Sequence, residues 1–251
     1  MSKPHAVSDT EWQARCELAA LYRLVAHFRM TDLIDTHITL RIPGPEQHFL
    51  INRYGVLFDR MCASDLVRID QHGNVVDQAF GERRINAAGF VIHSAIHTAR
   101  PDLHCVIHTH TAAGIAVSAQ EQGLLPISQH ALKFYGKLAY HQYEGIALSL
   151  DERERLIADL GPHKAMILRN HGLLVGGASV AEAFHEIHFL ERACQAQVQA
   201  LAGGGKLVYP SEQVCRHTAE QFARDDAAQI ISLSWNAALT LIEHQRESYC
   251  S

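Results

Sequence analysis

The sequence lacks the features that mark several large classes of protein. None of its six cysteines forms a Cys-x-x-Cys pair, and a chain of 251 residues is too large to need disulfide bonds for stability. No apolar run is long enough for a membrane helix, and the polar segment 1–9 lacks the apolar core of a signal peptide. Nothing suggests the clustered Lys and Arg of a nucleic-acid surface. We therefore expect a cytoplasmic protein with reduced thiols and neither nucleic-acid nor membrane partners.

What the chain does contain is typical of a globular domain with many histidines. Hydrophobic residues make up 47%, charged residues 20%, and the net charge is -5. A chain of this length can bury one sizeable core. The 18 histidines are unusual. Because histidine is the commonest metal ligand and titrates near neutral pH, we expect roughly three or four of them to be functional.

Hydrophobic periodicity and capping signals predict helices interspersed with hairpins. Ser8 with Glu11 and Ser179 with Glu182 have the spacing of capping boxes that open helices. Predicted helices cover 9–30, 86–99, 111–120, 151–160, 180–202 and 211–244. Predicted strands cover 36–42, 49–52, 67–70, 73–76, 103–109, 138–140, 165–170 and 173–175.

The order of these elements predicts the fold class. Helices alternate with hairpins, which favours an α/β domain with a mixed, largely antiparallel sheet covered by helices. We find no internal repeat, linker or break in composition. The sequence therefore predicts a single domain over 1–251, with a core over about 10–205 and a C-terminal helix over about 211–245.

Two apolar segments end in histidine. The run 103–110 ends in His108-Thr109-His110, and side chains two apart on a strand point the same way. A second run, 165–172, ends in His171 and a glycine. Three imidazoles with an open position form a known catalytic arrangement for a divalent cation. The competing interpretation is that these histidines cap backbone groups and bind no metal.

These motifs carry a family resemblance. His108-Thr109-His110-Thr111 followed by Leu168-Arg169-Asn170-His171-Gly172 resembles the class II aldolase/adducin-head family. The resemblance extends from about Cys16 to Ala202. It implies a three-layer α/β/α sandwich, a divalent metal on the three motif histidines, and a homotetramer with sites near subunit contacts.

The chain also departs from the family's sugar-phosphate aldolases. Those enzymes carry Ser-Ser-Glu where this chain has Ala87, Ala88 and Gly89, and Gly-Asn where it has Thr36 and His37. The resemblance gives those serines a phosphate-binding role and that glutamate an acid–base role. Since alanine and glycine can do neither, a phosphorylated sugar is an unsuitable substrate.

Other polar residues are candidates to replace the missing groups. His93 lies four residues after Gly89 on the same predicted helix, so it shares that face and is our candidate catalytic residue. Its alternative roles are a fourth metal ligand, a residue that hydrogen-bonds a metal ligand, or a structural histidine. His97 lies one turn further along, and a protonated His37 would suit an anionic substrate.

Candidate substrate-binding residues lie in two further segments. Asn52, Arg53 and Gly55 form a loop where the family contacts substrate, and Arg53 could pair with a carboxylate. Tyr140 is our candidate for a polar group at the pocket, and the alternatives from the same segment are Gln129, His130 and Tyr135. With His37, these residues complete the predicted small-molecule site.

The predicted function is that of a metal-dependent carbon–carbon lyase. A cation in this site would stabilise the enolate formed by aldol cleavage or decarboxylation of a small non-phosphorylated, carboxylated substrate. Zn is the first candidate, with Mn, Fe, Co and Ni as alternatives. Two other functions remain open: a non-catalytic adducin-like oligomerisation or scaffold module, and an epimerase that shares the metal.

Overall fold

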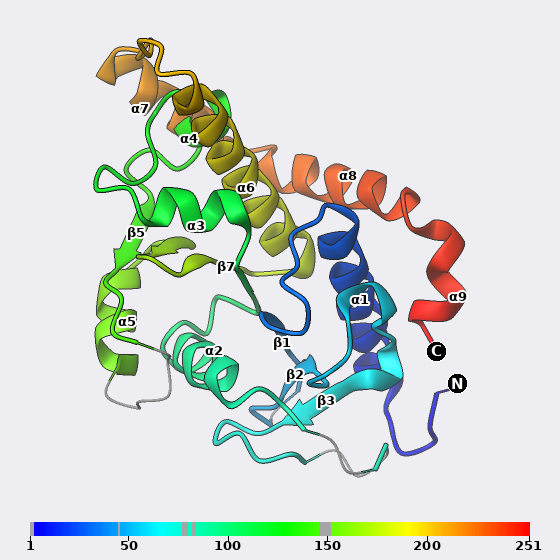
Figure 1. Cartoon of the computed structure of the whole chain (residues 1–251). Coiled ribbons are helices and arrows are strands. Elements are labelled where there is room, and N and C mark those ends of the chain that lie inside the picture. Colours follow the sequence, from blue (N-terminus) through cyan, green and yellow to red (C-terminus); the bar gives the residue numbers. More distant parts are fainter. Residues whose placement is uncertain (1–2, 45, 77–79, 82–83, 146–151) are drawn as a thin grey trace.

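The computed structural model describes residues 3–44, 46–76, 80–81, 84–145 and 152–251 (Figure 1). The strands are β1 His37–Arg41, β2 Phe49–Asn52, β3 Leu66–Ile69, β4 Cys105–Thr109, β5 Leu138–His141, β6 Ala165–Leu168 and β7 Gly172–Gly177. The helices are α1 Asp9–His27, α2 Ala87–Ala99, α3 Ala112–Ser118, α4 Gln129–Leu132, α5 Glu152–Leu160, α6 Val180–Ala202, α7 Glu212–Gln221, α8 Ala227–Thr240 and α9 Arg246–Tyr249. The predicted helix 151–160 corresponds to α5, and its predicted first residue, Asp151, lies outside the described residues.

The strands form one mixed sheet in the order β3-β2-β1-β4-β7-β6-β5. Only β5 and β6 pair in parallel among these neighbours, so the expected largely antiparallel sheet is confirmed. The neighbouring strands β1 and β2, and likewise β6 and β7, form antiparallel hairpins. Of the predicted strands 67–70 and 73–76, the first forms β3, and the second folds back on it through a single bridge between Ile69 and Val75 and backbone hydrogen bonds from Asp70 to Asn74 and from Val76 to Arg68.

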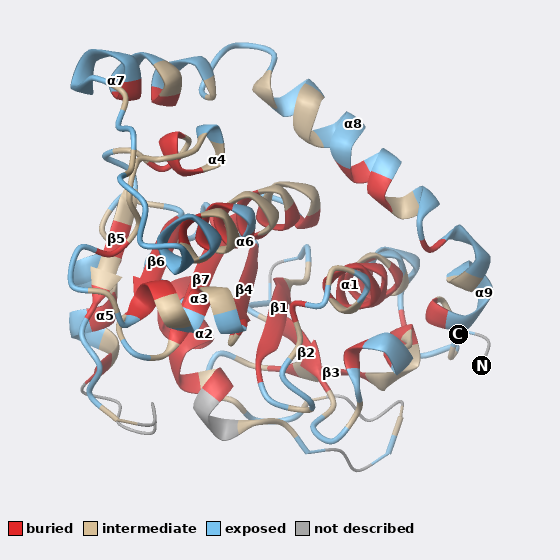
Figure 2. Ribbon diagram, turned by 45° about the horizontal axis from the view of Figure 1, so that its top comes forward, coloured by how far each residue is buried: buried red, intermediate tan, exposed pale blue. Residues whose placement is uncertain are grey.

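Helices cover both faces of the sheet, which gives the expected three layers (Figure 2). On one face, Ile92 and Ile96 of α2 and Leu156 of α5 pack with Val106 of β4. On the other, helices α1, α3 and α6 pack on alternate strand residues such as Ile107. The alternation of β4 therefore turns His108, two residues after Val106, toward the α2 face.

The capping residues begin their helices as predicted. The Ser8 hydroxyl accepts the Glu11 N–H at 3.1 Å, and the Ser179 hydroxyl accepts the Glu182 N–H at 3.1 Å. Each bond satisfies one of the free N–H groups at a helix start. Helix α6 ends at Ala202, directly before the triple glycine.

The prediction of one continuous helix over 211–244 is wrong. Helices α7 and α8 are separate, and the chain turns between Phe222 and Asp226. Two consecutive aspartates are weak helix formers, and the Arg224–Asp226 ion pair at 2.5 Å stabilises the turn. Helix α8 then packs on the body through Trp235 and Ala238. Within the described part of the chain, every helix is too short or too polar to cross a bilayer.

Candidate metal centre

The ends of strands β4 and β7 hold the three motif histidines. His108 is in β4, and His110 follows it just before Thr111, whose hydroxyl caps α3 by accepting the Gly114 N–H at 3.1 Å. His171 lies in the turn between β6 and β7, after Asn170 with a left-handed φ of 55°. Gly172 must be glycine here, because a Cβ would lie 2.3 Å from the carbonyl oxygen of Thr109. This close approach brings His171 beside the end of β4.

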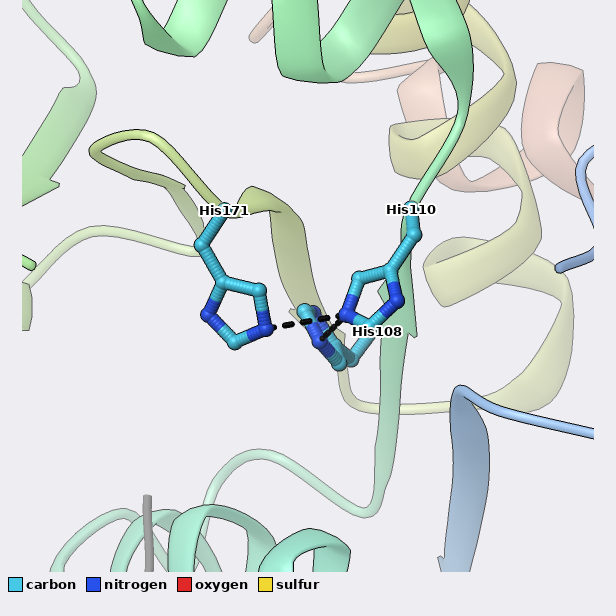
Figure 3. A group of neighbouring side chains, drawn as sticks. All are labelled: His108, His110 and His171. Carbon is cyan, nitrogen blue, oxygen red and sulfur yellow. Dashed lines mark hydrogen bonds between the residues drawn. The ribbon is translucent and has the colours of Figure 1, made fainter. Parts of the chain in front are cut away.

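The three imidazoles point toward one another (Figure 3). The Nε2 atoms of His108 and His110 are 2.8 Å apart, and those of His110 and His171 are 2.9 Å apart. One ligand atom from each of the three lies within 4.8 Å of the others. A tetrahedral zinc with Zn–N bonds of about 2.1 Å would separate two nitrogens by roughly 3.3 Å, so a small expansion of the triad accommodates an ion. The cluster thus has the composition and size of a divalent-metal site.

Hydrogen bonds at the opposite ring nitrogens favour metal binding. His108 Nδ1 lies 2.9 Å from the carbonyl oxygen of Leu173, and His110 Nδ1 lies 3.2 Å from Asp32 Oδ2. Both oxygens can only accept, so each Nδ1 carries the proton and each neutral ring presents an unprotonated Nε2. Two lone pairs at 2.8 Å repel unless a proton or cation lies between them. Such outward-facing partners are typical of metal-bound histidines, and the triad therefore fits a metal.

Burial keeps two of these imidazoles neutral. It lowers the pKa of His108 well below its usual value, with smaller contributions from His37, His171 and His110. Burial, followed by the electrostatic effect of the neighbouring His110 imidazole, lowers the pKa of His171 to about 4. Both rings are therefore unprotonated near neutral pH and available as ligands.

A second group of histidines lies in a hydrogen-bonded chain behind the first. The Nδ1 of His97 donates to the carbonyl oxygen of Leu103 at 3.2 Å, which leaves its Nε2 as an acceptor. The Thr39 hydroxyl donates to that Nε2 at 2.7 Å and accepts from His93 Nδ1 at 2.7 Å. His93 Nε2 is therefore unprotonated, and it is buried without a hydrogen-bond partner.

His37 belongs to the second group and lies between His93 and the first group. Its ring centroid is 4.5 Å from that of His93 and 5.3 Å from that of His108. Burial lowers the pKa of His37 to about 3, with contributions from His110 and His171 that the Thr36 backbone partly offsets. The predicted protonated His37 is therefore disfavoured in this structure, because the ring is buried beside other imidazoles. Gly89 lies directly against this ring.

The other predicted substrate-binding residues make contacts elsewhere in the fold. Asn52 is buried, with its backbone N–H donating to the Tyr22 hydroxyl at 3.2 Å. Arg53 pairs with Asp65 at 2.9 Å while its side chain stays 42% exposed, and Gly55 provides a left-handed turn with φ 92°. These contacts hold the loop that follows Asn52 against the fold.

Tyr140 and Tyr143 lie on a different segment. The Tyr140 hydroxyl accepts the Leu124 N–H at 3.0 Å, and the Arg169 guanidinium lies 4.4 Å from its ring centroid. Tyr143 is 53% exposed, and its ring centroid lies 6.3 Å from that of His171. Tyr143 thus lies beside one of the three motif histidines, and sequence reasoning missed it.

Sequence reasoning also missed two residues that orient histidines. Asp32 lies 78 positions before His110, and Thr39 lies 54 positions before His93. No local spacing links such partners, because the sheet brings them together. Thr39 carries one usable signal, since it is a polar residue on the same strand face as His37.

Comparisons with known proteins show the family to which the chain belongs. The family model described as the class II aldolase and adducin N-terminal domain matches residues 16–198, so the chain belongs to the class II aldolase/adducin family. The crystal structure of an aldolase II superfamily protein from Pseudomonas syringae is 52% identical, with TM-score 0.91 and 98% of each chain covered. An L-fuculose 1-phosphate aldolase from Glaciozyma antarctica is 30% identical, with TM-score 0.83 over 98% of this chain and 96% of its own.

The family also contains relatives named adducins. Alpha-adducin of Rattus norvegicus is 48% identical over 192 residues, which are 76% of this chain and 26% of adducin. This chain therefore corresponds to about a quarter of that relative. The family resemblance predicted from the histidine motifs is confirmed, since the matches include both aldolases and adducins.

Proposed function

We propose that the protein is a divalent-metal-dependent carbon–carbon lyase acting on a small, non-phosphorylated, carboxylated substrate. Membership of the class II aldolase family supports a lyase-type function. The single observation that carries the metal is the convergence of His108, His110 and His171 through their Nε2 atoms. Zinc is our first candidate because it takes three imidazoles readily, while Mn, Fe, Co and Ni remain alternatives.

In this proposal, different residues of the chain hold the metal, orient its ligands and transfer a proton. His108, His110 and His171 would hold the cation, which when bound would supply Lewis-acid stabilisation of negative charge developing on a substrate oxygen. The Leu173 carbonyl and Asp32 hold two of these rings in orientation. His93 remains our candidate catalytic residue, since its Nε2 carries a lone pair and has no partner; burial lowers its pKa well below the usual value and so makes it a weak base.

The substrate preference follows from what surrounds the triad. Buried neutral imidazoles, rather than cations, lie beside His108. Such a surrounding favours hydroxyl or carbonyl groups over a phosphate dianion, whose burial requires positive charge. Arg53, exposed and shared with Asp65, is our candidate for a substrate carboxylate, with Asn52, Gly55 and Tyr140 as further candidate contacts.

The proposal is tested by metal analysis followed by an activity screen. We expect about one divalent ion per chain after purification or reconstitution, and cleavage of some member of a panel of 2-keto-4-hydroxy and 3-keto carboxylates. Chelation should abolish cleavage and reloading should restore it. Substituting His104→Ala, an exposed histidine just before β4, is the matched control and should leave both properties unchanged. A protein that binds no divalent ion after reconstitution contradicts the proposal.

A non-catalytic scaffold is the second candidate function. The observation that favours it is the 48% identity to alpha-adducin over 192 residues. A scaffold would form the same oligomer, which we propose to be a cytoplasmic homotetramer, whether or not metal is bound. Retained assembly of His108→Ala, together with no turnover by the metal-loaded wild-type protein across the panel, would favour this alternative.

A further inference from the structure

His37 occupies an unusual position beside the metal centre. It pairs across the sheet with His108, and their ring centroids are 5.3 Å apart. The residue before it, Thr36, has a left-handed φ of 74°, which non-glycine residues rarely adopt. Such backbone strain persists only where the surrounding structure imposes it, and it is concentrated at functional sites. The backbone is therefore strained at Thr36, directly before His37.

Gly89 provides the room for the His37 ring. A Cβ built on Gly89 would lie 2.6 Å from the Cγ, Nδ1 and Cε1 atoms of His37, closer than real Cβ atoms approach their neighbours. Any other residue at position 89 must displace the ring. Gly89 belongs to helix α2, where glycine otherwise weakens the helix. The two residues are thus sterically coupled across helix α2 and strand β1.

The His37 ring lacks the hydrogen bonds that buried polar groups normally make. His37 is 4% exposed, and neither ring nitrogen has a partner of normal geometry. The neighbouring His93 Nε2 also lacks one. Buried polar atoms left unpaired are costly, and each such atom requires an explanation. Because the His37 ring centroid lies 5.3 Å from that of His108, a small ligand bound beside His108 could supply the missing partner.

We propose that the His37 imidazole, seated in the space that Gly89 leaves open, is a specificity-determining residue that hydrogen-bonds a substrate hydroxyl or carbonyl oxygen. This inference rests on the proposed metal site. A neutral imidazole offers one donor and one acceptor, which matches a hydroxyl group that both donates and accepts. Gly89 then acts as a positioning residue, because its missing side chain fixes where the ring lies.

The first test is a double-mutant cycle on thermal unfolding, which needs no activity. Gly89→Ala should lower the melting temperature in the wild-type background, because the new Cβ displaces the ring. In a His37→Ala background the same change should leave the melting temperature unchanged or raise it, since alanine favours helix. Gly203→Ala, where a Cβ meets no atom within 4 Å, is the matched control. The same effect of Gly89→Ala in both backgrounds overturns the coupling.

The second test measures binding of glycolate, a small hydroxy acid, to the metal-loaded proteins by calorimetry. His37→Ala should weaken glycolate binding about tenfold, the typical effect of one lost hydrogen bond, while the metal content stays at the wild-type value. Gly89→Ala should weaken it in the wild-type background only. His37→Asn, which retains a donor and an acceptor, should recover part of the loss.

The outcomes separate this inference from the proposed function. If reconstituted wild-type protein holds no metal, the proposed function fails first and the inference fails with it. If the metal is bound but glycolate binds equally, or not at all, in wild type and His37→Ala, the metal site stands and the substrate role of His37 is overturned. Exposed His104→Ala should behave as wild type in this titration.

Discussion

Two groups of three histidines lie side by side in this fold, and they differ in where their nitrogens point. The outer group, His108, His110 and His171, turns its Nε2 atoms toward a common centre. The inner group, His37, His93 and His97, is almost fully buried. Two of its members share the Thr39 hydroxyl rather than facing a common point.

The difference shows that the hydrogen-bond partners of a histidine decide which ring nitrogen is available to a ligand. In the outer group, acceptor oxygens hold the Nδ1 protons of His108 and His110 and leave lone pairs directed at one another. In the inner group, a single hydroxyl satisfies one nitrogen from each of two rings. The first arrangement favours a cation between the converging nitrogens, whereas in the second the Thr39 hydroxyl pairs with His93 Nδ1 and His97 Nε2 and leaves His93 Nε2 and both nitrogens of His37 without partners.

The largest expected effect is the loss of metal from the outer group alone. His171→Ala should weaken divalent-metal binding by at least about a hundredfold, beyond the 10–100-fold effect of losing an outer partner. His97→Ala, in the inner group, should retain wild-type affinity. Calorimetric titration of both variants with Zn²⁺ makes the measurement. Equal losses in the two variants would show that metal binding does not distinguish the outer group from the inner group.

Much of the outer group could be predicted from the sequence, because strand alternation and two apolar runs place it. His108 and His110 are two residues apart, and His171 ends the neighbouring run. The inner network could not be predicted, since Thr39 and His93 meet only when β1 packs beneath α2. Similarly, the order of helices and hairpins predicted a mixed sheet covered by helices, and the family resemblance implied its three layers. The break between α7 and α8 depended on a charged turn that hydrophobic periodicity does not indicate.

The next effect concerns the stability of the inner group. Thr39→Val conserves shape but removes the hydroxyl, which leaves one nitrogen each of His93 and His97 unpaired. Since an unsatisfied buried group costs about 1–3 kcal/mol, we expect unfolding to become easier by roughly 2–4 kcal/mol. Urea unfolding measures this loss, and metal content should not change. Thr240→Val, at an exposed helix end, is the control and should have little effect.

A smaller effect should come from the partner that orients the outer group. Asp32→Asn removes the carboxylate charge 3.2 Å from His110 Nδ1 but keeps an acceptor oxygen. Loss of such a partner typically weakens metal binding about 10–100-fold, and because the amide still accepts and the site is half exposed, we expect the lower end. Competition with a chromophoric zinc chelator measures the affinity. An unchanged affinity would mean that Asp32 does not orient the ring.

The smallest effect separates the two groups by pH. Burial lowers the pKa of His97 to about 3, with Arg41 adding to the shift and the Leu103 carbonyl opposing it. The unfolded chain, with a pKa near 6.5, therefore binds a proton that the folded chain excludes between those values. This contribution to stability is complete above pH 6.5 and is lost as the pH falls toward 3.

His97→Gln keeps a donor and an acceptor for Thr39 and Leu103 but removes the titrating ring. We expect it to reduce the slope of unfolding free energy against pH by about 1 kcal/mol per pH unit between pH 5 and 6.5. Urea unfolding of the chelator-treated protein at several pH values gives that slope without depending on absolute stability. Because the ring contacts Thr39 rather than the metal ligands, the change in slope should be the same after metal is restored. A slope that differs from wild type only in the metal-loaded protein would instead couple His97 to the outer group.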